Sequence, residues 1–413
     1  MTGKTENKKG YKKTKLGWIP DDWEVVKLSS ICQKIIGGGT PSTLNNDFWK
    51  GNIPWISSSD INNYGNINIR KYISQKAIDN SATNIIPSGS VIVVTRVGLG
   101  KVALSDFDLC TSQDFQSIIV NNNFVINKYL KLCISNLIDR IINNCQGSTI
   151  KGITKDQISN LDLLLPKKVE QEKIAEILST WDDGIETLEK LIKKKEIQHK
   201  ALMKILLKGI IKFSKKWAHS KLNKIFERLT RKNEKQNINI LTISAQNGLI
   251  SQEDYYYKRI ASVDTSKYIL LKRGEFAYNK SYSKGYPFGA IKRLDLYEEG
   301  VVSSLYICFK SKTSDICSDF WKYYFEAGLL DREIKMIAQE GARNHGLLNI
   351  IAEDFFNILL YYPENIEEQQ KIAETLNNSE KEIELLNSKL KKLKKQKKGL
   401  MQKLLTGQIR VKV

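Results

Sequence analysis

Two long stretches of the chain repeat apolar residues at alternating spacings of four and three positions. This spacing places the apolar side chains on one stripe of a helix, as in the seam of a coiled coil. The pattern therefore predicts two long, uninterrupted helices that pair through these stripes. The seam positions are Ile174, Leu178, Trp181, Ile185, Leu188, Ile192, Lys195, His199, Leu202 and Leu206 in the first stretch, and Ile372, Leu376, Ser379, Ile383, Leu386, Leu390, Leu393, Lys397, Leu400 and Leu404 in the second.

An amphipathic helix lying on a globular core would show a similar stripe. Both stretches, however, begin after a proline (Pro166 or Pro363), open with acidic residues and close with lysines before a glycine. That charge order suits the dipole of a continuous helix. Helices that lie on a core also seldom run this long without a break, so we favour paired helices.

The two stretches are copies of one sequence. Residues 170–209 match residues 368–407 at a constant offset of 198, without a gap. A repeat of this length indicates duplication, so the chain is predicted to contain two copies of one unit.

The charges of the two helices predict their direction and register. Each helix is acidic in its first half and lysine-rich in its second half, so only antiparallel pairing sets opposite charges side by side. Full overlap then pairs seam residues whose numbers add to 578. This register places His199 beside Ser379 and Trp181 within contact distance of Lys397, whose ammonium group and stem could lie over the indole ring. From first to last seam residue the paired helices would extend about 48 Å.

The helices separate two larger modules. We predict modules at 1–168 and 214–364, with the helices at 169–213 and at 365–413, the latter including the C-terminal tail. Each module mixes short β-branched runs with helical stretches, at 127–144 in the first and at 318–339 in the second. This mixture indicates an α/β (α+β) fold for each module. The modules also share landmarks, such as Trp23 and Trp217 near their starts.

The composition favours a polyanionic partner. The 65 lysines and arginines exceed the 45 acidic residues, which gives a net charge of +20 and a pI near 9.4. Nucleic acid is the first expectation for such a chain, although a coding bias toward Lys, Asn and Ile would account for part of the charge. The six cysteines have no CxxC spacing, and no run approaches 18 apolar residues. We therefore expect reduced thiols in a soluble, cytoplasmic protein with no membrane partner.

Motifs for catalysis or metal binding are not apparent. The three histidines are scattered, and His199 lies in the helical seam, where a packed polar layer is the simpler interpretation. The glycine-rich segment 96–101 lacks the residues of a phosphate-binding loop and is interpreted as a turn after a strand. The tetrapeptide 52–55 resembles that of amino-methyltransferases, but its second residue is not proline. We predict a non-catalytic protein without a bound metal.

Several segments resemble one family closely. They are 11–31 (YKKTKLGWIPDDWEVVKLSSI), 37–42 (GGGTPS), 51–61 (GNIPWISSSDI), and the related pair 161–178 and 359–376. In these segments, and in the order of modules and helices, the chain resembles the specificity subunits of type I restriction-modification systems. The resemblance implies two target recognition domains, the modules above, joined by an antiparallel coiled coil with an internal pseudo-two-fold repeat.

The resemblance also implies a function and partners. Such a subunit reads a bipartite, asymmetric site on double-stranded DNA and has no catalytic centre. Two modification (methyltransferase) subunits would dock on it and methylate adenine N6, and two restriction (translocase-nuclease) subunits would complete the endonuclease. S-adenosylmethionine, ATP and magnesium would belong to those partners. Because the strands of DNA are antiparallel, two similar modules that read both halves need the same two-fold arrangement as the paired helices.

Chemistry ranks candidate DNA contacts in the glycine-flanked polar loops. Arginine suits guanine, asparagine and glutamine suit adenine, and hydroxyl or lysine side chains suit phosphate. A solvated loop side chain explains each residue equally well. The candidates are Thr40, Ser42, Ser57, Ser58, Thr95, Arg96, Gln146, Ser148, Thr149 and Lys151 in the first module, and Ser244, Gln246, Asn247, Lys280, Tyr282, Lys284, Arg343, Asn344 and His345 in the second.

A function of a different class fits the same helices. The chain would then be a non-catalytic coiled-coil scaffold with two protein-binding globular ends, whose basic charge serves only solubility. A scaffold of this kind would show no site-dependent binding to DNA and would not need a methyltransferase.

Overall fold

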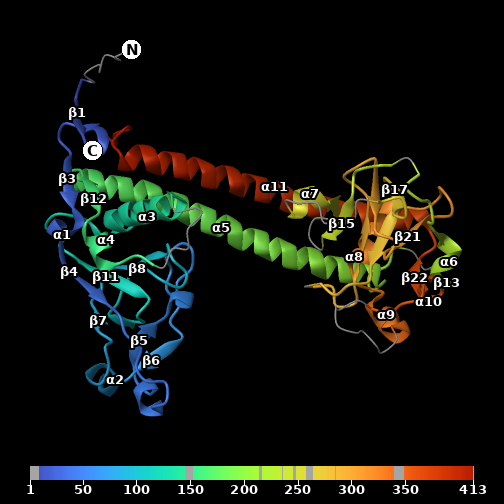
Figure 1. Cartoon of the computed structure of the whole chain (residues 1–413), viewed down its shortest axis with the longest axis horizontal. Coiled ribbons are helices and arrows are strands. Elements are labelled where there is room, and N and C mark those ends of the chain that lie inside the picture. The colour runs from blue at the N-terminus through green and yellow to red at the C-terminus, as the bar shows by residue number, and fades with distance from the viewer. Residues whose placement is uncertain are drawn as a thin grey trace. The chain divides into compact units, whose positions relative to one another are not determined.

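The computed structural model describes residues 9–144, 152–213, 216–234, 236–244, 248–256, 264–283, 285–338 and 348–412 (Figure 1). Residue contacts divide the chain into two units. Unit 1 comprises Met1–Lys190 with Ser388–Val413, and unit 2 comprises Leu191–Asn387. The long helices α5 (Lys168–Leu207) and α11 (Ile366–Leu405) each contribute one part to each unit.

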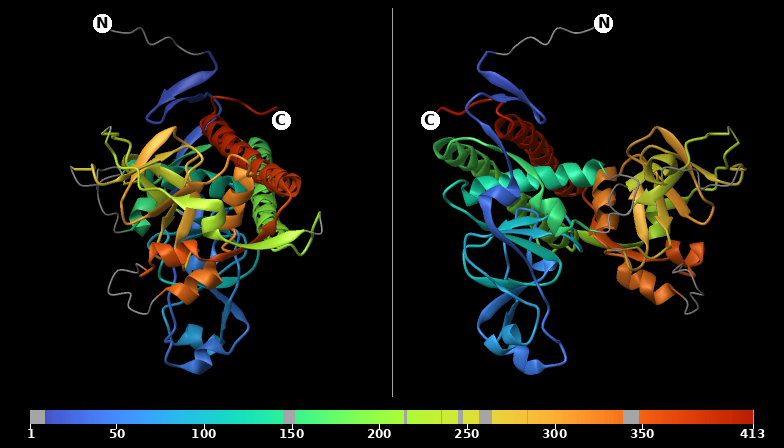
Figure 2. Two further views of the ribbon diagram at one scale, coloured as in Figure 1. Left: turned by 90° about the vertical axis from the view of Figure 1, so that its right-hand side faces the viewer. Right: turned by 60° about the vertical axis from the view of Figure 1, so that its left-hand side comes forward.

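Unit 1 is built in three layers. Its central antiparallel sheet has the strand order β4-β11-β8-β9. One face packs against α3 (Asn127–Asn144) and α5 in the largest hydrophobic cluster, and the other packs on the smaller sheet β6-β5-β10-β7. Figure 2 shows these strands, in blue and cyan, below the helices. The strands are β4 (Cys32–Gly37), β5 (Ile53–Ile56), β6 (Lys71–Ile73), β7 (Ile85–Ile86), β8 (Val91–Val94), β9 (Val102–Leu104), β10 (Leu109–Thr111) and β11 (Phe115–Val120).

Shorter elements complete unit 1. The hairpin β1-β2 lies against the end of α11, where the Tyr11 hydroxyl donates to the Gly407 carbonyl at 2.9 Å (Figures 1 and 2). The ladder β3-β12 joins the two ends of the module. The bounds are β1 (Tyr11–Thr14), β2 (Gly17–Pro20), β3 (Glu24–Lys27), α1 (Leu28–Ile31), η1 (Asn46–Trp49), η2 (Ser58–Asp60), α2 (Gln75–Asp79), α4 (Lys155–Ser159) and β12 (Asp162–Leu165).

Unit 2 repeats this plan. Its central sheet has the order β14-β21-β18-β19, with the ladder β13-β22 joining the module ends and the pairs β15-β16 and β17-β20 beside them. The bounds are β13 (Trp217–Lys221), α6 (Leu222–Ile225), β14 (Phe226–Arg228), β15 (Leu241–Ser244), β16 (Gly248–Ser251), α7 (Gln252–Tyr256), β17 (Ile269–Lys272), β18 (Phe276–Asn279), β19 (Ala290–Arg293), β20 (Glu299–Val302), β21 (Ile307–Ser311), α8 (Ser318–Glu326), α9 (Asp331–Ile337), α10 (Ala352–Phe356) and β22 (Leu359–Pro363).

The helix predicted over 318–339 is two helices. The chain leaves α8 and enters α9 through Gly328, whose φ of +66° favours glycine. The side chain of Asp331 is only 3.1 Å from the position that a Cβ on Gly328 would take. The prediction was wrong at this point because the apolar pattern continues through the break.

The seam residues of both long helices face inward. The described seam positions are all buried or partly buried, whereas most of the positions between them are exposed. In unit 1, Ile174 and Leu178 share a hydrophobic cluster with Leu404. In unit 2, Leu206 shares a second cluster with Ile372. These groupings agree with the antiparallel register expected from the sequence.

Polar contacts between the helices agree with the same register. In unit 2, Nδ1 of His199 lies 3.1 Å from Oγ of Ser379, the predicted pair, and burial lowers the pKa of His199. Lys195 pairs with Glu382 at 2.8 Å. As residue numbers rise along α5, the numbers of their partners in α11 therefore fall, as antiparallel pairing requires.

The ammonium group of Lys397 does not lie over the indole face that the sequence suggested for it. Its ammonium group forms an ion pair with the carboxylate of Asp182 rather than lying over the ring of Trp181, one residue earlier. A carboxylate attracts an ammonium group more strongly than an indole face does. The ion pair is consistent with the predicted register, since Asp182 is adjacent to Trp181, and only the suggested position of the ammonium group differs.

A buried glutamate anchors the start of α5 in unit 1. The side chain of Glu170 is 2% exposed and accepts a hydrogen bond from Nε1 of Trp23 at 3.0 Å. Both oxygens also accept from the guanidinium of Arg410, at 2.6 and 2.8 Å. Hydrogen bonds that the guanidinium donates to Glu170 and Asp22 raise the pKa of Arg410 above its usual value. The N-terminal strands, the start of α5 and the C-terminal tail thus meet at one carboxylate.

Unit 2 has the equivalent anchor. Oε1 of Glu368 accepts from Nε1 of Trp217 at 3.1 Å and from the amide of Phe213 at 2.9 Å. Lys212 occupies the place of Arg410, with its ammonium 5.7 Å from the centre of the Trp217 ring. The duplicated sequence therefore folds into a duplicated contact.

The cysteines and the helices of the described residues have the following properties. The cysteines that the structure describes are free thiols, while Cys145 lies outside the described residues. In the same part of the chain, no helix has the length and apolar character needed to cross a membrane. Nor does that part hold a cluster of three or more histidine, cysteine or acidic residues suited to a metal ion.

Replacing the buried anchor should destabilise unit 1. We expect Glu170→Ala to lower the free energy of unfolding by about 2–3 kcal/mol, because it leaves the Trp23 indole N–H without its acceptor and the Arg410 guanidinium with Asp22 alone. Glu172→Ala, at an exposed position two residues later, is the control and should change it by less than about 0.5 kcal/mol. Urea denaturation checks both variants, and equal stabilities would contradict the anchoring role of Glu170.

Candidate nucleic-acid interface

The loops that follow four strands of unit 1 lie together. Strand β5 is parallel to β10, and β4 and β8 both run antiparallel to β11, so all four end near the start of β11. Backbone hydrogen bonds join the loops: Ser112 N to Ile56 O at 2.9 Å, Gly39 N to Thr111 O at 2.8 Å, and Thr95 N to Asp114 O at 2.7 Å. We call residues 38–42, 57–60, 95–101 and 112–114 the loop cluster of unit 1.

Two glycines allow the first of these loops to pass between its neighbours. A Cβ on Gly38 would lie 2.1 Å from the Ser112 carbonyl oxygen, and one on Gly39 would lie 2.4 Å from the backbone of Ala82. Real Cβ atoms do not approach backbone atoms this closely. The glycine run is therefore required by packing rather than by flexibility.

The glycine passage positions Thr40 and Ser42 at the surface. Both side chains are exposed, and the Thr40 hydroxyl donates to Oε1 of Gln113. Two indoles hold the backbone beneath them: Trp55 Nε1 donates to the Gly39 carbonyl at 3.0 Å, and Trp49 Nε1 donates to the Ser42 carbonyl at 3.1 Å.

The loop after β5 is held by a buried carboxylate. Asp60 is 4% exposed and accepts hydrogen bonds at 2.7 Å from both the amide and the hydroxyl of Ser57. It also pairs with Arg70, whose guanidinium donates to the Ser59 hydroxyl at 2.6 Å. Burial acts to raise the pKa of Asp60, but the Ser57 hydrogen bonds and Arg70 hold this pKa below its usual value. The stabilisation from Asp60 is thus present above the unfolded pKa and is lost as the pH falls through the folded pKa.

The candidates of the first module divide into framework and surface residues. Thr95 is 2% exposed, and its hydroxyl donates to the Asp114 carbonyl at 3.0 Å, so it joins two loops. Ser58 is buried as well, and its carbonyl accepts from Nζ of Lys101 at 3.1 Å. Arg96, by contrast, is exposed. Thr40, Ser42 and Arg96 are therefore the surface candidates, with Ser57 partly exposed beside them.

The second module has an equivalent loop after β18. The Lys280 carbonyl accepts from the amide of Leu348 at 3.0 Å, just as the Thr95 carbonyl accepts from the amide of Ile153 at 2.9 Å. Lys280 itself is partly buried, and burial lowers its pKa. Tyr282 is 65% exposed, whereas Ser244, at the end of β15, is 5% exposed.

The remaining candidates lie outside the described residues, and they stay predictions. They are Gln146, Ser148, Thr149, Lys151, Gln246, Asn247, Lys284, Arg343, Asn344 and His345.

Sequence reasoning missed three polar residues of the first module that lie at the cluster. They are Ser59 and Arg70 at the turn after β5, and Gln113 beside Thr40. Ser59 adjoins predicted candidates and was open to prediction. Arg70 follows Asp60 by ten residues, and no local pattern relates the two.

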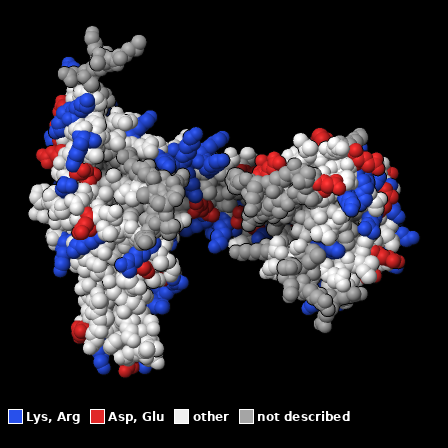
Figure 3. Space-filling model, viewed as in Figure 1, with Lys and Arg blue, Asp and Glu red and all other residues white. Residues whose placement is uncertain are grey.

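Charges of both signs lie on the face that Figure 3 shows. Figure 3 shows lysine and arginine side chains on the visible face of both units, with acidic side chains scattered among them.

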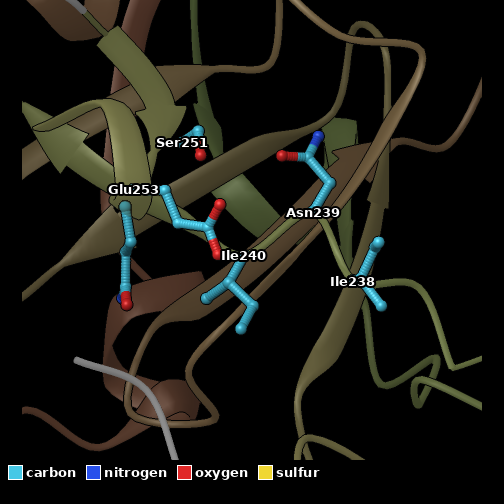
Figure 4. Close-up of a pocket in the computed structure, with 6 residues that line it drawn as sticks. Ile238, Asn239, Ile240, Ser251 and Glu253 are labelled. Atoms are coloured by element: carbon cyan, nitrogen blue, oxygen red, sulfur yellow. The ribbon is translucent and has the colours of Figure 1, made fainter. Parts of the chain in front are cut away.

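A pocket of about 250 Å³ in unit 2 is lined by Ile238, Asn239, Ile240, Ser251, Gln252 and Glu253 (Figure 4). Because Leu241 pairs with Ser251, this pocket lies at the end of the β15-β16 hairpin away from Ser244.

Comparisons with known proteins agree on one family. Residues 20–199 match the model of the type I restriction modification DNA specificity domain. The MjaIX specificity subunit of Methanocaldococcus jannaschii is 33% identical over 202 residues, which cover 48% of this chain and 45% of the relative. The MjaVIII specificity subunit of the same organism is 25% identical over 429 residues, which cover 95% and 94%. In its alignments with the more similar curated relatives, the chain spans less than half of their length.

A solved structure shares the fold. The S subunit of a type I restriction-modification system from M. genitalium superposes with a TM-score of 0.53 at 14% identity, and the match covers 93% of this chain and 96% of that subunit. Unlike the family model, this similarity extends over both modules and both long helices.

A methyl group at the glycine passage should disrupt the loop cluster. We expect Gly38→Ala to lower the free energy of unfolding by about 1–3 kcal/mol, because the new Cβ meets two backbone carbonyl oxygens. Gly184→Ala is the control, since nothing lies within 4 Å of its Cβ position in α5. Alanine at this helical position should raise the free energy of unfolding by about 0.5–1 kcal/mol. Thermal unfolding of both variants provides the test. A loss at Gly184 as large as that at Gly38 would contradict the packing argument.

Proposed function

Because the chain belongs to the family of type I restriction-modification specificity subunits, we propose that it reads DNA for such a complex. Each module would bind one half of a bipartite target on double-stranded DNA, and the paired helices would set the spacer between the halves. The chain itself would perform no chemistry.

The repeated layered module supports this proposal most directly. In unit 1 the polar ends of four strands form a loop cluster on a rigid sheet, and in unit 2 the loop after β18 is fastened by the same backbone contact. Exposed arginine, tyrosine, serine and threonine side chains on a rigid frame suit base edges and phosphates. Arg96 is the strongest single candidate in unit 1, because an exposed guanidinium can bind O6 and N7 of guanine together.

The chemistry would come from partner subunits. We propose that two modification subunits dock on this chain and methylate adenine N6, and that two restriction subunits complete the endonuclease in the cytoplasm. S-adenosylmethionine, ATP and magnesium would then be bound by those partners rather than by this chain. The helices of each unit offer the partners a surface that is exposed away from the seam.

Exchange of one module tests whether each module reads its own half of the target. Residues 30–160 would be replaced by the matching segment of another such subunit, and methylated adenines would be mapped in a host that also carries the modification subunit. We expect a single split motif for the parent chain, and for the exchange a motif that differs in one half only. A second exchange, of residues 223–357, is the matched control and should change the other half. Changes in both halves from either exchange would contradict the two-module proposal.

Salt dependence separates DNA reading from a scaffold role. If basic side chains of both modules neutralise 6–10 phosphates, the affinity for duplex DNA should fall by roughly 10³–10⁵ between about 50 and 200 mM salt. Fluorescence anisotropy of a labelled duplex carrying the mapped motif measures the slope for the assembled methyltransferase, with a scrambled duplex as the control. A nearly constant affinity over this range would favour the scaffold.

A further inference from the structure

The loop after the turn at Ser57–Asp60 touches a long helix. Residues 62–67 leave the loop cluster of unit 1 and return to it through the bridge between Ile61 and Ile67. Nδ2 of Asn66 donates to both carboxylate oxygens of Glu186 in α5, at 3.0 and 3.1 Å. This contact joins residues 120 positions apart in the sequence.

A tyrosine of the same loop meets the next turn of α5. Burial and a hydrogen bond with Glu189 raise the pKa of Tyr64 above its usual value. Glu189 in turn forms an ion pair at 2.5 Å with Lys394 of α11. Asn66 therefore contacts α5 directly, and the Tyr64 hydroxyl is influenced by the carboxylate of Glu189, three residues further along the same helix.

Hydrogen bonds and close packing hold this loop in one position on the module. Oδ1 of Asn62 accepts from the amides of Tyr64 and Asn66, both at 2.9 Å. Gly65 has a φ of +78°, and a Cβ there would lie 2.2 Å from the Val102 carbonyl oxygen. Nζ of Lys131 in α3 also donates to the Tyr64 carbonyl at 3.0 Å. Backbone and helix contacts thus fix the loop on the module, while its side chains contact α5.

Unit 2 makes a comparable contact from a different element. The Tyr323 hydroxyl of α8 donates to Oε2 of Glu380 in α11 and to Oδ1 of Asn377 at 2.7 Å. Lys322 pairs with the same Glu380 at 3.1 Å. In both units, then, a side chain of the module donates a hydrogen bond to a glutamate of a long helix.

We propose that loop 62–67 is a brace that fixes the orientation of the first module on α5, and that Tyr64 and Asn66 are positioning residues for the spacing between the two target halves. The inference rests on the proposed function. The bases read by the module would depend on the loop cluster, whereas the tolerance for spacer length would depend on the brace. One added base pair turns the second half of the target by about a tenth of a helical turn, so a loosened module would accept it more readily.

The test compares loop variants within the assembled methyltransferase. Asn66→Ala and Tyr64→Phe remove one contact each, and Asn66→Asp places a carboxylate against Glu186. Asn63→Ala is the matched control, because Asn63 is exposed in the same loop. The readout is the methylation rate on duplexes carrying the mapped motif with its own spacer, or with one base pair more or fewer.

We expect the preference for the native spacer to fall roughly threefold to tenfold in the Asn66 and Tyr64 variants. Asn66→Asp should show the largest change, Asn63→Ala should match the parent chain, and the bases of both halves should stay the same. An unchanged spacer preference would overturn the proposal, and so would a change in the bases of the first half.

Hydrogen exchange tests the brace independently of the proposed function. The amides of Gly65 and Asn66 should exchange faster in Asn66→Ala than in Asn63→Ala, because the loop loses its contact with the helix. Equal exchange would overturn the brace even in a complex that methylates normally. A parent complex that methylates no split motif would instead count against the proposed function, while the exchange result would still decide the brace.

Discussion

The buried glutamate at the start of each long helix is the contact on which the arrangement of each unit depends. A carboxylate removed from water is costly unless it is paired and hydrogen-bonded. Glu170 meets this requirement only when Trp23, the start of α5 and the tail residue Arg410 come together. Glu368 imposes the same condition on Trp217 and the segment that follows α5. Each carboxylate thus ties the end of one long helix to the start of the other.

Besides these anchors, the apolar seam stabilises the paired helices, and the charges favour the antiparallel orientation. Buried apolar side chains such as Ile185 and Leu188 contribute most of the favourable energy, at about 25 cal/mol per Å² of apolar surface. Exposed ion pairs such as Lys195 with Glu382 contribute little individually. Their number and sign nevertheless disfavour a parallel pair, which would bring acidic halves together. The polar layer of His199 and Ser379 adds a position at which a slipped register would leave an imidazole against apolar side chains.

Features with a local period could be predicted, and features that depend on distant contacts could not. The seven-residue repeat specified both helices, the charge order specified their direction and register, and the strands around Val91–Val94 and Phe115–Val120 followed from β-branched runs. The break at Gly328 was missed because its cause is a backbone conformation rather than a change in the apolar pattern. The pairing of Arg70 with Asp60 and the contact of Asn66 with Glu186 depend on tertiary structure. For the same reason, the sequence offered Thr95 and Arg96 as equals, although one lies in the framework and the other at the surface.

The loop cluster separates the residues that shape the site from those that face outward. Its shape depends on glycines without room for a side chain, on backbone hydrogen bonds between loops, and on buried groups such as the carboxylate of Asp60. The structure of this framework depends little on the exposed side chains, such as Arg96. Substitution at such positions should therefore alter what the surface binds at little cost in stability, since surface changes away from packed features usually shift it by less than about 0.5 kcal/mol. A scaffold of this kind can change its recognition chemistry while the helices, the anchors and the sheet beneath it stay as they are.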